Sequence, residues 1–153
     1  MSTLQSVPAI VVPGHRVASG ENNNPRFPGG TLRMQAPFFR ELGLDLSRFH
    51  NGTVNVSVAP AVYQVVRPCM MFPQVKWHPV EPAEDFLFFD VKVYPPGGRG
   101  TAGYIYYPSP ETKPEHFQKP GVLELLLPFI YGLHYGMKLH VEVPAEQMRF
   151  ELP

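Results

Sequence analysis

Thr53-Val54-Asn55-Val56-Ser57-Val58 is the stretch that decides the fold. Polar and β-branched apolar residues alternate in it without a break, which is the pattern of a strand with one buried face. Successive side chains of a strand point to opposite sides, so Thr53, Asn55 and Ser57 are expected on one face and the three valines in the core. Asn51-Gly52, directly before it, indicates a turn. The segment therefore predicts a β-strand entered from a tight turn.

More strands are predicted on both sides of this segment. Apolar, β-branched and aromatic residues between turn signals predict them at residues 7–12, 61–67, 86–94, 103–107, 122–127 and 138–143. One short helix is predicted between Thr31 and Gly43, and Pro37 favours a start near Ala36. The 19 prolines and 13 glycines among 153 residues favour short strands and turns over a helical bundle. We therefore predict a mostly β, single-domain protein (residues 1–153), folded as a small closed β-barrel with one short helix.

The charge balance excludes several classes of partner. Lys plus Arg and Asp plus Glu number 13 each, so no basic excess is available for a nucleic-acid backbone or an anionic membrane surface. The first ten residues lack the basic and apolar regions of a signal peptide. We therefore expect a cytoplasmic protein that binds neither nucleic acid nor membrane. Cys69, the single cysteine, is expected to be a small buried hydrophobe.

Several common catalytic signatures are missing from the sequence. It has no Gly-Lys-Ser/Thr triplet of a P-loop and no Gly-x-Ser-x-Gly elbow. The six histidines are dispersed, and each is expected to be a surface or core residue rather than a zinc ligand. Gly97-Gly98-Arg99-Gly100 could cradle an anion, but a hairpin turn is favoured. The acidic residues Glu81, Glu84 and Asp85 are expected in a solvated loop.

The polar face of residues 53–58 offers oxygen ligands. A threonine hydroxyl and an asparagine carbonyl are hard donors, suited to Mg²⁺ that retains waters and takes its charge balance from substrate phosphates. Polar residues on the solvated face of an antiparallel strand are also commonplace, and periodicity alone favours that simpler interpretation.

The same residues carry a resemblance to a known family. Gly52-Thr53-Val54-Asn55-Val56 resembles the Gly-Thr-Leu-Asn-Val signature of the CTP-dependent riboflavin kinases found mainly in archaea. Leu42-Gly43-Leu44 upstream is similar to the segment that leads into this motif, and Gly14-x-x-Val17-x-Ser19-Gly20 resembles the family's opening motif. Downstream, Thr112, His116 and Leu123-Glu124-Leu125-Leu126-Leu127-Pro128 are similar to its Thr-x-His stretch and following strand. The matches cover residues 12–143 in the family's order.

This resemblance implies a cradle-loop β-barrel that transfers the γ-phosphoryl group of CTP to riboflavin and yields FMN. By position, Thr53 and Asn55 would hold Mg²⁺, and Gly14, Val17, Ser19 and Gly20 would bind the nucleotide. Thr112, His116 and Glu124 would bind the flavin; no catalytic acid or base is assigned. The implied partners are a nucleoside triphosphate and riboflavin or a similar acceptor, and the oligomeric state is not predicted.

The sequence departs from the family in two places. Its glycine-rich loop is replaced by Glu21-Asn22-Asn23-Asn24-Pro25, and its Leu-Arg and Gly-Asp pairs have no counterparts within residues 129–137. Two alternatives therefore stay open: a barrel that binds a nucleotide or flavin without turnover, and an interaction protein that reuses the fold.

Overall fold

The computed structural model describes residues 3–14, 25–112 and 121–152. Over these residues the protein is mostly β with one short helix, as predicted. The strands are β1 (Leu4–Val12), β2 (Val54–Ser57), β3 (Val62–Val65), β4 (Met70–Val75), β5 (Glu84–Tyr94), β6 (Thr101–Pro108), β7 (Val122–Leu126), β8 (Lys138–Pro144) and β9 (Met148–Glu151). The helix is α1 (Thr31–Glu41). None of the described helical residues belongs to a helix long and apolar enough to span a bilayer.

Seven strands form one antiparallel sheet in the order β4-β5-β6-β7-β2-β1-β8. The last strand, β8, also pairs with the end of β5 through Lys92–Tyr94, so the hydrogen bonds close into a ring. β4 pairs with the other end of β5 and lies outside this ring, so the sheet is not an even barrel. β3 and β9 form a separate two-stranded sheet.

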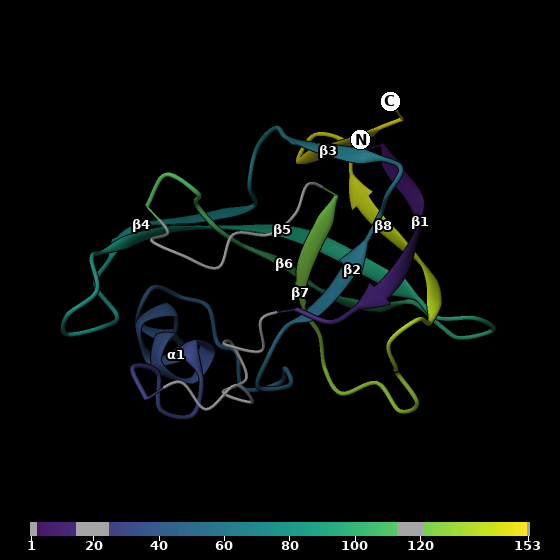
Figure 1. Ribbon diagram of the computed structural model, residues 1–153. Coiled ribbons are helices and arrows are strands. Elements are labelled where there is room, and N and C mark those ends of the chain that lie inside the picture. The colour runs from purple at the N-terminus through teal and green to yellow at the C-terminus, as the bar shows by residue number, and fades with distance from the viewer. Residues whose placement is uncertain (1–2, 15–24, 113–120, 153) are drawn as a thin grey trace.

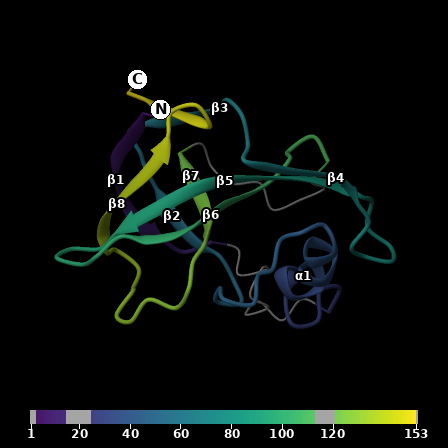
Figure 2. The same ribbon diagram turned by 180° about the vertical axis from the view of Figure 1, so that it is seen from behind.

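Two hydrophobic clusters lie on opposite faces of this sheet. The core positions predicted for Val56 and Val58 are confirmed, and Val54 is partly buried against the same cluster inside the ring. β5 is buried on both faces: Phe89 and Val91 belong to the ring interior, whereas Phe86 and Phe88 belong to a second cluster beneath α1. Figures 1 and 2 show α1 beside the long ribbons of β5 and β6, away from β1 and β8. The outer face of the sheet is therefore partly covered by the helix.

The helix begins earlier than predicted. It starts at Thr31 after Gly30 and contains Pro37, so the expectation of a start near Ala36 is wrong. Thr31, Leu32 and Phe39 are buried, and their packing compensates for the hydrogen bond that Pro37 removes. Gly43 follows the helix with φ 105°, the left-handed conformation expected after a helix end.

Two strands and one thiol differ from the predictions. β4 and β9 were not predicted. β4 contains Pro73, and its pairing with β5 shifts register between Phe72 and Val75. Proline is tolerated there because β4 is an edge strand.

Cys69 is exposed rather than buried, and its thiol donates to the Phe88 carbonyl at 3.2 Å. Partial burial and then the charge of Asp90 raise the pKa of Cys69 to about 11, so the thiol is poorly nucleophilic at neutral pH.

Candidate functional site

A row of polar residues crosses the outer face of the ring. Strand pairing sets Val12 opposite Asn55, Asn55 opposite Glu124, and Glu124 opposite Tyr106. Directly paired residues of neighbouring strands point to the same face, so Asn55, Glu124 and Tyr106 are side by side on β2, β7 and β6. The sequence predicted Asn55 and Glu124 for different subsites, and the fold places them next to each other.

Thr53 and Gly14 complete this group from the ends of their strands. The Thr53 hydroxyl donates to Glu124 Oε1 at 3.3 Å. A Cβ atom added to Gly14 would lie 2.0 Å from Asn55 Nδ2 and 2.8 Å from Asn55 Cγ. The backbone at Gly14 therefore lies directly against the Asn55 amide, at a distance that only glycine permits without displacement. Gly14, predicted to bind the nucleotide, therefore lies against Asn55, which was predicted with Thr53 to hold Mg²⁺.

The sequence did not predict that Tyr106 and Gln35 extend the row of polar residues from β6 to α1. Tyr106 donates from its hydroxyl to Gln35 Oε1 at 2.6 Å, linking β6 to α1. Complete burial, and then the charges of Glu124 and Glu84, raise the pKa of Tyr106 well above its usual value, so the phenol stays protonated. We call Thr53, Asn55, Glu124, Tyr106 and Gln35 the polar cluster. Gln35 shares the buried face of α1 with Thr31, Leu32 and Phe39, and a glutamine at such a position is a mild sequence signal for a buried polar contact.

The polar cluster is buried, contrary to the simpler interpretation of the sequence. Asn55 is 8% exposed and Glu124 is 9% exposed, so the polar face of β2 is not an ordinary solvated face. Thr53 is half-buried. No buried side-chain nitrogen or oxygen of the described residues lacks a hydrogen-bond partner. Burying a carboxylate beside amide and hydroxyl groups costs free energy unless each group forms hydrogen bonds. The hydrogen bonds of the polar cluster therefore fix the relative positions of its side chains.

The donor set of the polar cluster fits a magnesium ion. Thr53, Asn55 and Glu124 bring a hydroxyl, an amide carbonyl and a carboxylate together, all of them hard oxygen donors. Within residues 3–14, 25–112 and 121–152, no group of three or more His, Cys, Asp or Glu side chains could hold a metal. Glu124 is the one carboxylate among these three donors, so a divalent ion held by them would keep a positive charge that a bound phosphate would balance.

Thr112 is the one remaining predicted ligand residue that the structure describes, and its hydroxyl is engaged in a turn. The Thr112 hydroxyl accepts from the Asp85 backbone N–H at 2.9 Å and donates to the Ser109 carbonyl at 3.3 Å, so it holds the turn after β6. Val17, Ser19, Gly20 and His116 lie outside the described residues. The nucleotide and flavin roles assigned to these residues stay predictions.

The acidic residues Glu81, Glu84 and Asp85 do not form the solvated loop that was expected, because Glu84 and Asp85 are the first two residues of β5. Glu84 is buried and accepts from Trp77 Nε1 at 2.8 Å. Glu81 pairs with Arg26 at 3.1 Å, and Asp85 accepts from the Gln74 backbone N–H at 2.8 Å. These carboxylates stabilise the connection between β4 and β5, a structural role. The segment 97–100 forms the β5–β6 hairpin turn, as predicted.

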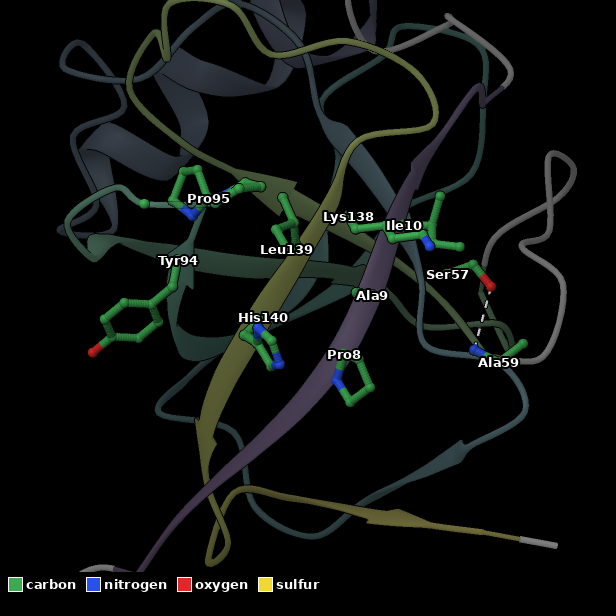
Figure 3. A pocket seen from close by; sticks show the side chains of 12 residues that line it. Pro8, Ala9, Ile10, Ser57, Ala59, Tyr94, Pro95, Lys138, Leu139 and His140 are labelled. Atoms are coloured by element: carbon green, nitrogen blue, oxygen red, sulfur yellow. Dashed lines mark hydrogen bonds between the residues drawn. The ribbon is translucent and has the colours of Figure 1, made fainter.

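A cavity of about 640 Å³ opens on the outer face of β1 and β8. Figure 3 shows Pro8 and His140 side by side on these strands, Lys138 beside Ile10, and Tyr94 from β5 at one border. Ser57 lines the opposite border and lies on the same face of β2 as Asn55. The cavity therefore adjoins the polar cluster along β2 but contains none of its members.

Comparison with known protein families, curated proteins and solved structures finds no match to this chain. The resemblance to the riboflavin kinases therefore rests on the short ordered motifs alone.

Proposed function

We propose that this protein is an Mg²⁺-dependent phosphotransferase, built on a cradle-loop barrel of the riboflavin-kinase type. The proposed donor is a nucleoside triphosphate, CTP by resemblance, and the proposed acceptor is riboflavin, giving FMN. The observation that carries the proposal is the grouping of half-buried Thr53 with buried Asn55 and Glu124 beside Gly14. These are the residues at which the family motifs fall.

The proposed site would work by positioning and charge neutralisation. Thr53 Oγ1, Asn55 Oδ1 and a Glu124 carboxylate oxygen would hold Mg²⁺, which when bound to the triphosphate neutralises the charge of the transferred group. Phosphoryl transfer requires little covalent chemistry from a protein, so a site without a nucleophile or P-loop is compatible with it. Thr53 is half-buried, whereas Asn55 and Glu124 are buried, so a metal–nucleotide complex would approach the polar cluster from the side on which Thr53 lies.

Gly14 would allow the backbone of the segment that starts at this residue to approach the nucleotide closely. A side chain at this position would displace the Asn55 amide, which supports the role that the resemblance gives to the segment starting at this residue. Because β1 pairs with β2 up to Val12 opposite Asn55, the start of this segment is held in register with the proposed metal site.

A barrel that binds such ligands without turnover is the second candidate. Glu124 is the one acidic side chain in the polar cluster, fewer than the paired carboxylates that hold metals in many phosphotransferases. The apolar lining of the neighbouring cavity also suits a binding protein.

A turnover assay separates the two candidates. The full chain is incubated with riboflavin, Mg²⁺ and each of CTP, ATP, GTP and UTP, and FMN is measured by chromatography with fluorescence detection. We expect FMN with at least one donor, and its loss when EDTA is added. Retention of riboflavin without any FMN would favour the binding protein, whereas neither binding nor FMN would contradict both candidates.

A further inference from the structure

The connection between β7 and β8 holds large aromatic side chains out in solvent. We call residues 128–137 the aromatic loop; it contains no Asp, Glu, Lys or Arg. Phe129 is 75% exposed and Tyr131 is 93% exposed. Tyr135 of the same loop is 54% exposed, and apolar surface that gathers in one place commonly marks a binding site.

The aromatic loop is nevertheless firmly anchored. Ile130, Leu133 and Met137 pack against the core of the ring. The Leu133 backbone N–H donates to the Ile130 carbonyl at 3.3 Å, and Met137 donates to the His134 carbonyl at 3.1 Å. The aliphatic side chains therefore turn inward while Phe129 and Tyr131 point outward, so their exposure follows from an ordered backbone.

Both ends of the aromatic loop are attached to segments that carry the proposed site. At its start, the Leu127 carbonyl accepts from the His50 backbone N–H at 2.9 Å, shortly before Thr53. At its end, Gly136 donates to the Val11 carbonyl at 2.8 Å, and Val11 donates to the Met137 carbonyl at 3.0 Å, shortly before Gly14. Figures 1 and 2 show the loop, in yellow-green, projecting below the ring near the start of β8, whereas α1 lies below the other end of the sheet, under β4 and β5.

We infer that Phe129 and Tyr131 form a stacking platform for the flat heteroaromatic ring of a ligand whose other end, the triphosphate of CTP or the ribityl hydroxyl of riboflavin, reaches the polar cluster. The inference rests on the proposed function and adds the residues that bind the ring. Aromatic side chains bind planar heterocycles by stacking, and the missing charges favour a neutral ring such as isoalloxazine or cytosine. A protein partner is less favoured, because the two rings are carried by one projecting loop beside the cluster rather than by a broad apolar face.

The test compares a loop variant with a matched surface variant. The double variant Phe129→Ser/Tyr131→Ser removes both rings, and Val80→Ser removes an apolar side chain that is 81% exposed on the β4–β5 connection. Riboflavin binding is measured by fluorescence quenching, and CTP binding with Mg²⁺ by calorimetry, with inorganic tripolyphosphate as a probe without a ring. Thermal unfolding reports whether each variant is folded.

We expect the double variant to bind riboflavin, CTP or both at least about tenfold more weakly than the wild type, with tripolyphosphate binding and thermal stability retained. The ligand that is weakened identifies the ring that stacks. Val80→Ser should bind like the wild type. Unchanged binding of both ring ligands in the double variant, or no binding of either by the wild type, would overturn the inference.

FMN production is measured in the same samples, so that a failure of the stacking platform can be distinguished from a failure of the proposed kinase activity. FMN formed equally well by the double variant would overturn the stacking platform and leave the kinase proposal standing. Loop-dependent riboflavin binding without FMN would reject turnover and leave the platform standing. A double variant that changes only from dimer to monomer in sedimentation would assign the rings to a second copy of the chain and overturn the inference.

Discussion

Replacement of Phe39 by alanine is expected to lower the free energy of unfolding by about 3–5 kcal/mol, the usual cost of deleting a buried aromatic ring. Phe39 is fully buried in α1, and its ring centroid lies 4.9 Å from Phe86, 5.3 Å from Phe88 and 5.9 Å from Phe72. These contacts attach the helix to β4 and β5. The change is measured by urea unfolding followed by circular dichroism.

Phe38 provides the matched control for this prediction. It precedes Phe39 in α1 but is 38% exposed. Phe38→Ala should therefore cost about 1 kcal/mol or less. Equal losses for the two variants would contradict the packing of α1 on the sheet.

Replacement of Asn55 by leucine is expected to reduce Mg²⁺-dependent FMN formation at least about 100-fold, the scale on which loss of a preorganised polar group slows catalysis. Leucine keeps the approximate shape of the side chain but removes the amide oxygen proposed as a metal ligand. It also removes polar partners from a buried neighbourhood, so the variant should lose about 1–3 kcal/mol of stability while remaining folded. Rates are compared at saturating Mg²⁺ and riboflavin, below the unfolding temperature of the variant.

Ser57→Ala is the control on the same face of the same strand. Ser57 lines the neighbouring cavity, and its hydroxyl accepts from the Ala59 backbone N–H at 3.3 Å. This variant should retain nearly wild-type turnover. An Asn55→Leu protein as active as Ser57→Ala would remove Asn55 from the proposed metal site.

The sequence predicts local structure well where one period dominates. The alternation of residues 53–58 predicts both β2 and the burial of Val56 and Val58. It fails at β4, because Pro73 is a poor strand residue except at an edge, and edge position depends on the whole sheet. It also misplaces the start of α1, because Pro37 is tolerated inside a helix that tertiary packing stabilises.

The candidate site was predictable only in its parts. Thr53 and Asn55 stand out because polar residues interrupt a valine run, and Glu124 because it interrupts a leucine run. Their contact depends on the pairing of β2 with β7, which joins segments about 70 residues apart, and local patterns do not encode such pairing. The burial of Asn55 likewise follows from Gly14 and from neighbouring strands, not from its own segment.

The central claim, that Thr53, Asn55 and Glu124 form a metal–nucleotide site, is tested most directly by nuclear magnetic resonance with Mn²⁺ in place of Mg²⁺. Paramagnetic Mn²⁺ broadens the resonances of nearby groups. In the presence of CTP we predict selective broadening of the Asn55 side-chain amide and of the Thr53 and Gly14 backbone amides, reversed by excess Mg²⁺. Broadening confined to other residues, such as Lys138 and His140 in the cavity, or no broadening at all, would contradict the claim.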